Sequence, residues 1–473
     1  MANINDYIPR RSNGIVNQEE LIIMEEKFEI IISGDSMYPF LQNGEKVKAQ
    51  TVDPSSIVIE DIIVYQKFED HLTAHRVVEI MNLSERRKCF VTKGDNNSKK
   101  DDYIVHPHQI IGRVIKKNKA EWTTERKLIL LLARLTFKEE VKIQIKKIII
   151  NHQLDWDYVL SVATTNKVCT LIFKNLFDLI PDINIPGDIK TDYRCLKLKL
   201  GVHNKYIFGQ YDLVAETLKN CGISLFPLKG SWLLPHLYKD LGLRSVNGID
   251  CLFDKKDEGN LIDAMGSIGY FQDQFNSFEK TITKFSRAKH IAWKSKMNSF
   301  PLFQKITGIP SCPVVTFDFS FALDLSLDQT PIKAMIEESV DGFLRKPHFF
   351  IHLCCHLYKE ATNAIWIMET TGLNIIKFCD IREYLLIMDS QEINEAIEFS
   401  KKYGIEKSVY FSCFYLGILY NEDYSFVLNR YQFENVNFLY QFGESNFSET
   451  STWKKLWIDF CYSNKGVDNV NLL

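Results

Sequence analysis

Hydrophobic and polar residues change their spacing once along the chain, near residue 120. Between residues 22 and 115, short runs rich in Val, Ile, Thr and aromatic residues are separated by Gly, Asp, Asn and Pro, a pattern typical of β-strands joined by turns. From Glu121 the spacing becomes helical, and thirty residues pass without Gly or Pro. After residue 151 the helical spacing continues, interrupted by strand-like runs near 223–254 and at 313–325. The pattern predicts a multidomain protein, with a small all-β domain followed by a mainly helical α+β domain.

A chain of 473 residues is too long for one ordinary hydrophobic core, and the same change of spacing marks where it divides into domains. We expect an N-terminal arm at 1–20, a β domain at 21–118, a basic helical connector at 119–150 and an α+β domain at 151–473. Between Lys116 and Lys147 there are ten Lys or Arg against four Glu. This excess favours a solvated helix, with weak peripheral contact to anionic lipid or to a charged partner as the alternative.

Composition narrows the class of protein. The formal net charge of −3 gives no global basic field, so no nucleic-acid partner is expected. The eleven cysteines include no CxxC pair, and an odd number fits reduced thiols better than a disulfide framework. The longest apolar run, at 128–133, is far shorter than the roughly 20 residues of a membrane span, and the N-terminus has no apolar leader. These features predict a soluble, cytoplasmic protein with no transmembrane segment.

One serine stands where an apolar, β-branched run ends, in the stretch IISGDSMYPF. A serine hydroxyl becomes a nucleophile only when a base takes its proton, and a histidine base is oriented by a carboxylate. The strand-like run LTAHRVVEI offers His75 as a base for Ser36. The stretch VTKGDNNSKKDD follows with Asp95, Asp101 and Asp102. Each residue alone is usually structural, but together they indicate a catalytic group.

The motifs SGDSMYP, AHRVV and TKGDNN followed by DD resemble the type I signal peptidases and the self-cleaving SOS repressors. Histidine before arginine in the second motif matches the endoplasmic-reticulum-type branch. The resemblance covers residues 31–115 and implies Ser36 as nucleophile, His75 as general base and Asp102 as acidic partner. One extra residue between GDNN and DD leaves Asp101 as the alternative partner. The backbone N–H of Ser36, with that of Ser33 as a second candidate, would form the oxyanion hole.

The chain also departs from that family, because no membrane anchor and no DNA-binding domain accompany the motifs. A cytoplasmic serine peptidase that cuts a peptide or protein precursor is therefore expected, without a cofactor. Asp95 would brace the loop beneath the site, and the resemblance implies small residues before the cut.

A second motif is FPLKGSWLLPHLYKDLGLRSVNGIDCLF, in which Gly-Ser after a strand precedes a helix and a further strand with a carboxylate. It resembles the bacterial uncharacterised nucleotidyltransferase family of the polymerase-β superfamily, over about 120–400. The resemblance implies that Gly230 and Ser231 form the phosphate turn. It also implies Lys229 and Arg244 as cations that bind phosphate or support the scaffold.

In that family two carboxylates at i and i+2 of one strand share a face and hold two Mg²⁺ ions. The resemblance implies Asp250 as one metal ligand and Asp318 as a candidate third carboxylate, with Mg²⁺ and a nucleoside triphosphate as cofactors. Gly248, however, stands where the family pattern has the first Asp. An active transferase and a remnant that only binds nucleotide or peptide both stay open.

His352, Cys354, Cys355 and His356 lie within five residues of each other, and histidines at i and i+4 can bind zinc. Flanking aromatic residues favour a buried helix instead. Three hypotheses for the whole chain follow. The first is a peptidase that matures a peptide held or modified by the second domain. The others are a nucleotidyltransferase controlled by self-cleavage and a catalytically idle scaffold.

Overall fold

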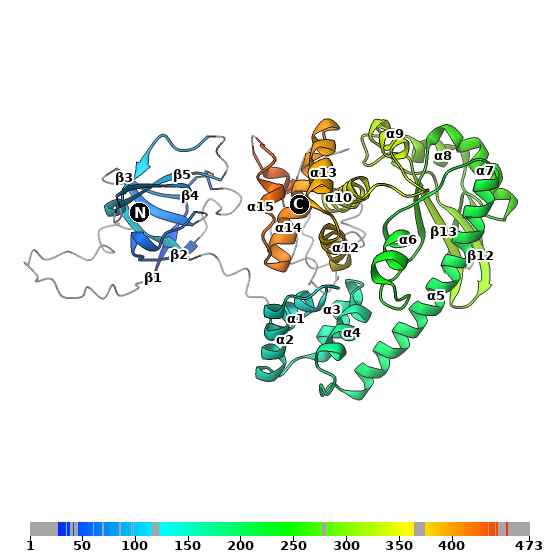
Figure 1. Cartoon of the computed structure of the whole chain (residues 1–473), viewed down its shortest axis with the longest axis horizontal. Coiled ribbons are helices and arrows are strands. Elements are labelled where there is room, and N and C mark those ends of the chain that lie inside the picture. The colour runs from blue at the N-terminus through cyan, green and yellow to red at the C-terminus, as the bar shows by residue number, and fades with distance from the viewer. Residues whose placement is uncertain are drawn as a thin grey trace, which may run out of the picture. The chain divides into compact units, whose positions relative to one another are not determined.

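The structure is a computed structural model of the 473-residue chain (Figure 1). It describes residues 27–34, 36, 37, 41, 46–59, 61–68, 71–84, 87–95, 97, 99–115, 123–276, 281–363, 374–433, 435–439, 441, 442, 451 and 452. The arm predicted at 1–20 lies outside these residues. The chain divides into two compact units, Met1–Glu121 and Trp122–Leu473, and each is described by itself.

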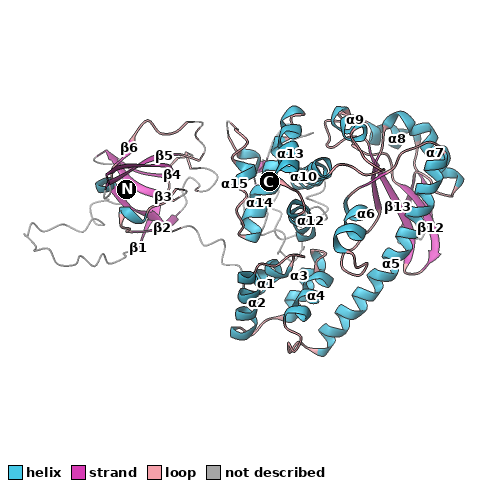
Figure 2. Cartoon of the chain, in the orientation of Figure 1, coloured by secondary structure: helices cyan, strands magenta, loops and turns pink. Residues whose placement is uncertain are grey.

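The first unit is built on one antiparallel sheet of seven strands, in the order β1-β2-β7-β3-β4-β5-β6 (Figure 2). The strands are β1 (Lys27–Ile31), β2 (Lys46–Gln50), β3 (Ile62–Phe68), β4 (His71–Ser84), β5 (Arg87–Lys93), β6 (Ile104–Val105) and β7 (Ile110–Val114). Short 3₁₀ turns occupy Pro54–Ser56 and Pro107–Gln109. The prediction of a strand-rich N-terminal region is confirmed.

Strand β3 has apolar side chains on both faces of this sheet. Successive side chains of a strand point to opposite faces, so Ile62 and Val64 pack into one buried cluster and Ile63 and Tyr65 into another. The unit therefore encloses two small cores, and the central strands β3 and β4 are held from both sides.

The second unit is mainly helical, as predicted, and contains a small mixed sheet in the order β12-β13-β9-β8. Its strands are β8 (Phe226–Pro227), β9 (Ile249–Leu252), β12 (Phe303–Ile309) and β13 (Cys312–Ser320). Strands β13 and β9 are parallel, and the two outer pairs are antiparallel. Two further hairpins pair β10 (Asp273–Asn276) with β11 (Thr281–Lys284), and β14 (Gln441–Phe442) with β15 (Ser451–Thr452).

Helices lie around this sheet and form a separate helical layer (Figure 1). They are α1 (Thr124–Leu132), α2 (Glu139–Asn151), α3 (Trp156–Thr165), α4 (Cys169–Leu179), α5 (Gly187–Asn220), α6 (Lys229–Leu233), α7 (Glu258–Ser267), α8 (Arg287–Lys294), α9 (Thr330–Glu337), α10 (Lys346–Thr362), α12 (Ile375–Leu386), α13 (Ser390–Lys402), α14 (Glu406–Tyr420) and α15 (Ser425–Leu428). Helical turns also occupy Leu234–Tyr238, Lys255–Asp257 and Asn437–Leu439.

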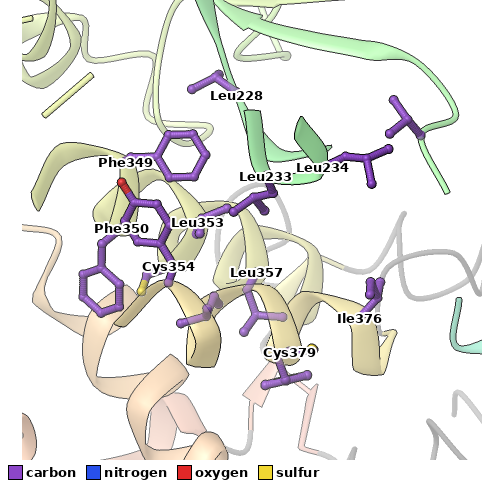
Figure 3. Close-up of a cluster of buried hydrophobic side chains, with 14 of the residues drawn as sticks. Leu228, Leu233, Leu234, Phe349, Phe350, Leu353, Cys354, Leu357, Ile376 and Cys379 are labelled. Carbon is purple, nitrogen blue, oxygen red and sulfur yellow. The ribbon is translucent and has the colours of Figure 1, made fainter. Parts of the chain in front are cut away.

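One large hydrophobic core joins the sheet to the helical layer. Figure 3 shows apolar side chains from the segment around α6 beside side chains of α10 and α12. The labelled residues are Leu228, Leu233, Leu234, Phe349, Phe350, Leu353, Cys354, Leu357, Ile376 and Cys379. All of them are buried, so α10 and α12 pack against the segment around α6, which follows β8.

The segment 119–150, interpreted above as a connector, contains helices α1 and α2. Four apolar residues of α1 are buried in the core of the second unit: Leu128, Ile129, Leu130 and Leu132. These side chains therefore do not form an exposed apolar face. Within the part of the chain that the structure describes, no helix combines the length and the hydropathy needed to cross a membrane.

Candidate functional site

The first unit brings Ser36 and His75 into contact, as the motifs predict. Ser36 lies in the loop between β1 and β2 and is half-buried. His75 lies on β4, where it pairs with Ile63 of the central strand β3. Nε2 of His75 is 3.0 Å from the Oγ of Ser36. This is the distance at which a histidine can take a proton from a serine hydroxyl.

The carboxylate beside His75 belongs to Asp101 and not to Asp102, the residue preferred from the sequence. Oδ2 of Asp101 is 2.5 Å from Nδ1 of His75. The backbone N–H of Asp101 donates to the carbonyl oxygen of Thr92 at 2.9 Å, and Oγ1 of Thr92 donates to Oδ2 at 2.7 Å. These two bonds hold Asp101 toward the site, while Asp102 is exposed.

Two buried hydroxyl groups that the sequence analysis missed support Asp101. Thr92 and Tyr65 are fully or almost fully buried, and the Tyr65 hydroxyl lies 3.2 Å from Oγ1 of Thr92. Because the Thr92 hydroxyl donates its proton to Asp101, Tyr65 is the donor in this second bond. Burial raises the pKa of Tyr65 to about 12, so its hydroxyl keeps its proton at neutral pH.

The loop after β5 is fastened beneath Ser36. Arg76 donates from Nε and Nη2 to the two carboxylate oxygens of Asp95, both at 2.8 Å, which is the bracing role expected of Asp95. Gly94 lies so close that a Cβ atom there would be 2.6 Å from the carbonyl oxygen of Ser36. Only glycine therefore allows the loop and the serine backbone to approach this closely.

In the second unit, Asp250 and Asp318 lie side by side on the parallel strands β9 and β13. The half-buried Lys229 donates from Nζ to Oδ1 of Asp250 at 2.8 Å. Oδ1 of Asp318 is buried and has no hydrogen-bond partner among the described residues. Burial, with a further contribution from Asp250, raises the pKa of Asp318 although Lys229 acts in the opposite direction.

The other predicted phosphate-binding residues have internal partners. Ser231 is buried, and its Oγ accepts the backbone N–H of Asp250 at 3.1 Å. Arg244 donates from Nε and Nη2 to the buried carboxylate of Asp380, with a shortest distance of 2.6 Å. A Cβ atom on Gly230 would lie 2.1 Å from Nη1 of Arg244. Of the two roles left open for Arg244, this geometry corresponds to the scaffold.

Four lysines that are distant in sequence surround these carboxylates, and we refer to Lys167, Lys229, Lys359 and Lys377 as the lysine cluster. Burial, reinforced by Lys229, lowers the pKa of Lys359 to about 8. Burial followed by the charges of Lys229, Lys167 and Lys359 lowers the pKa of Lys377 well below its ordinary value. Desolvation of its ammonium group, followed by the charge of Arg244, lowers the pKa of Lys167.

The histidines of α10 face this cluster. Nε2 of His356 lies 3.2 Å from one oxygen of Glu360, whose other oxygen contacts Lys377. Burial and Lys229 lower the pKa of both His356 and the stacked His352 well below the ordinary value, so both rings are neutral at pH 7. The neighbouring Cys354 and Cys355 are buried in the hydrophobic core.

The residues present do not fit the two-metal centre that the resemblance of the sequence motif implies. Gly248, where a Cβ atom would lie 3.2 Å from the carbonyl oxygen of Thr316, supplies no carboxylate. One oxygen of Asp250 already accepts Lys229. Within the described ranges, no three His, Cys, Asp or Glu side chains are grouped so that they could hold a metal ion. Asp250 and Asp318 together provide two carboxylates, which are too few for two ions.

Comparison with known proteins identifies one family. The sequence profile described as an uncharacterised nucleotidyltransferase matches residues 152–421, which include Lys229, Asp250, Asp318 and the lysine cluster. No curated protein and no solved structure matches the chain.

Proposed function

The chain belongs to the uncharacterised nucleotidyltransferase family, and we propose that it joins this nucleotidyltransferase-like domain to a serine peptidase that cuts a peptide or protein precursor. One observation carries the proposal. The ring of His75 contacts Ser36 through Nε2 and Asp101 through Nδ1, which is the arrangement of a nucleophile, a base and an orienting carboxylate.

The geometry supports a two-step hydrolysis of a peptide bond. As Oγ of Ser36 attacks the carbonyl carbon, its proton passes to Nε2 of His75, and Asp101 stabilises the imidazolium. The backbone N–H of Ser36 is the proposed donor to the oxyanion. The imidazolium then gives its proton to the leaving amine, and an acyl-serine remains. His75 then takes a proton from water, and the water oxygen attacks the acyl carbon. The ester C–O bond breaks, the new carboxyl end of the peptide leaves, and His75 returns the proton to Oγ of Ser36.

The second domain gives the peptidase a role in maturation. We assign it the binding or modification of the precursor, which the first domain then cuts, with small residues before the cleavage site. Linking a binding domain to a peptidase raises the local concentration of the substrate at the serine. This division of labour accounts for a peptidase joined to a nucleotidyltransferase-like domain whose carboxylate set is incomplete.

The alternative from another class is a Mg²⁺-dependent nucleotidyltransferase whose output the peptidase unit controls by self-cleavage. The pairing of Asp250 with Asp318 across β9 and β13 favours it. The glycine at position 248 and the bond from Lys229 to Asp250 weigh against it. A scaffold without either activity is the remaining hypothesis, and the experiments below exclude it if either activity appears.

The test is digestion of a proteome-derived peptide library, analysed by mass spectrometry, with wild type beside Ser36→Ala and His75→Ala. The proposal expects cuts that vanish in both variants and persist in Asp250→Ala. His108→Ala is the matched control, because His108 is an exposed histidine of the same unit. Cuts that persist in Ser36→Ala would refute a serine nucleophile.

Two further measurements distinguish the nucleotidyltransferase alternative from the peptidase. Self-cleavage would appear as fragments of the purified chain that are absent from Ser36→Ala. Transferase activity would appear as Mg²⁺-dependent turnover of a nucleoside triphosphate that survives Ser36→Ala and is lost in Asp250→Ala. If no library peptide is cut while this turnover occurs, the nucleotidyltransferase replaces the peptidase as the function of the chain.

A further inference from the structure

An open groove lies along the middle of the long helix α5. It has a volume of about 570 Å³ and is lined by α5 and by the segment 240–242. Two of its apolar residues, Leu198 and Val202, have exposed fractions of 71% and 51%. These side chains are four residues apart and therefore share one face of the helix. The described residues thus leave an apolar face of α5 uncovered.

The groove is kept open by a glycine between these two residues. Gly201 lines the groove, and a Cβ atom there would have no neighbour within 4 Å. Glycine within a helix is less stable than alanine, so the open space is not filled by the residue that would favour the helix most. A larger side chain at Gly201 would occupy the groove and would leave the hydrophobic core unchanged.

Positive charge accompanies the apolar face. Between residues 193 and 211, α5 contains no Asp or Glu and four basic residues: Arg194, Lys197, Lys199 and Lys205. Arg194 and Lys205 are exposed, line the groove and form no ion pair among the described residues. They are eleven residues apart, which is about 16 Å along a helix axis. This separation suits a chain of residues lying along α5 better than a single small anion.

The other charges at the groove are neutralised in pairs. Lys197 pairs with Asp240 at 2.9 Å, and both residues line the groove. Lys174 and Asp178, whose charges also act on this pair, bind each other at 2.9 Å. The positive charges of Arg194 and Lys205 therefore have no acidic counterpart among the residues that line the groove.

We propose that this groove binds an acidic, amphipathic segment of the peptide or protein precursor. The proposal rests on the proposed function, in which the second domain holds the precursor, and adds the place and the chemistry of that contact. Apolar side chains of the segment would pack on Leu198 and Val202, while its carboxylates would face Arg194 and Lys205. Apolar anchors at helical spacing suit a groove of this kind, and the complementary charges select against basic partners.

The first experiment is the capture of peptides from a proteome-derived library by immobilised full-length Ser36→Ala protein, which lacks the proposed nucleophile. Mass spectrometry identifies the retained peptides, and we expect enrichment in Asp and Glu beside large apolar residues. Adding Gly201→Leu should abolish their retention. Gly209→Leu is the matched control, because Gly209 lies on the same helix with equally open space and does not line the groove. Thermal unfolding verifies that each variant is folded.

Reversing the charges tests the stated chemistry. A fluorescent synthetic copy of one retained peptide measures Kd by anisotropy. Arg194→Glu combined with Lys205→Glu should weaken its binding at least about tenfold and should favour a copy in which Lys replaces each acidic residue. Lys219→Glu, which reverses one charge at the exposed end of α5, should leave both affinities unchanged.

Cleavage kinetics connect the groove with the precursor. One substrate is a short peptide from the library digest, and the other is the same peptide joined by a flexible linker to the retained segment. With Ser36 intact, Gly201→Leu should raise KM for the joined substrate about tenfold and leave kcat unchanged, because it removes the local concentration that the segment provides. The short peptide should show no change, whereas a general structural fault would affect both substrates.

Three results would overturn the proposal. They are retained peptides that are absent or not enriched in acidic residues, groove variants that bind as the control variants do, and an unchanged KM of the joined substrate in folded Gly201→Leu. Failure of the proposed function looks different. If no peptide is cut, the peptidase falls while capture and anisotropy still decide the groove; if short peptides are cut but none is retained, the peptidase stands and the groove falls.

Discussion

Replacing Asp101 by alanine should slow peptide cleavage far more than replacing the adjacent Asp102. Oδ2 of Asp101 lies 2.5 Å from Nδ1 of His75 and also accepts a hydrogen bond from Thr92, whereas Asp102 is exposed. Asp101→Ala removes the acceptor that keeps Nε2 of His75 turned toward Ser36. It also removes the charge that stabilises the imidazolium in the transition state.

The size of the effect follows from this contact. The charge centres of an imidazolium and a carboxylate joined in this way lie about 4 Å apart, and at an effective dielectric constant of about 20 they attract by about 4 kcal/mol. Because about 1.4 kcal/mol of transition-state stabilisation is a factor of ten in rate, Asp101→Ala should lower kcat about 10³-fold. Asp102→Ala removes an exposed carboxylate and should change kcat less than about threefold.

The assay is kcat on one synthetic peptide chosen from the library digest, with thermal unfolding to verify the fold of each variant. Asp101→Asn separates charge from geometry, since an amide oxygen could still accept from Thr92 and from His75. If charge dominates, Asp101→Asn loses nearly as much kcat as Asp101→Ala. Equal losses in Asp101→Ala and Asp102→Ala, or an Asp101→Ala enzyme within tenfold of wild type, would refute the reasoning.

Three other perturbations probe the packing around the two sites. Gly94→Ala would place a Cβ atom 2.6 Å from the carbonyl oxygen of Ser36. It should lower kcat at least about tenfold and the free energy of unfolding by about 1–3 kcal/mol. An unchanged kcat would contradict the close approach of the two segments. Arg244→Met leaves the buried Asp380 carboxylate without its cation and should lower the free energy of unfolding, measured in urea, by about 3–5 kcal/mol. A loss below about 1 kcal/mol would contradict a buried ion pair. The pKa of Lys359 is lowered to about 8 in the folded chain. Between about pH 8 and 10.5 the unfolded chain therefore binds a proton at Lys359 that the folded chain lacks. The stability of wild type relative to Lys359→Met should rise with pH across that window, by up to about 3 kcal/mol. Urea unfolding at pH 7 to 10 measures the difference, and a flat or falling difference would show that the amine titrates normally.

The pairing of Ser36 with His75 could be predicted from the sequence, because each residue lies in a short motif on or beside a strand. A strand fixes the face of its side chains by a period of two, so a histidine within a strand-like run can be assigned to one face of the sheet. The carboxylate could not be assigned in this way. Asp101 and Asp102 lie in a loop, and only the bonds to Thr92 decide which of them turns inward.

In the second unit, too, local sequence patterns could not predict contacts between residues that lie far apart in the chain. Helical spacing at 119–150 predicts helices, but the same amphipathic spacing suits a solvated connector and a helix such as α1, whose apolar side is buried. Lys359 and Lys377 lie more than 100 residues beyond Lys229, and no local pattern singles them out from other lysines on helices. Their position near Lys229 depends on how α10 and α12 pack against the segment around α6, which Lys229 begins.

The sequence by itself determined the change from strands to helices, the serine and histidine of the first unit, and the incomplete carboxylate set marked by Gly248. These features are local, because side-chain periodicity and residue identity within a short motif do not depend on distant packing. Only the tertiary structure decided which aspartate contacts His75, that Arg244 supports the scaffold through Asp380, and that Lys167, Lys359 and Lys377 lie near Asp250. Each of those depends on contacts between segments far apart in the chain, where burial and neighbouring charges act together.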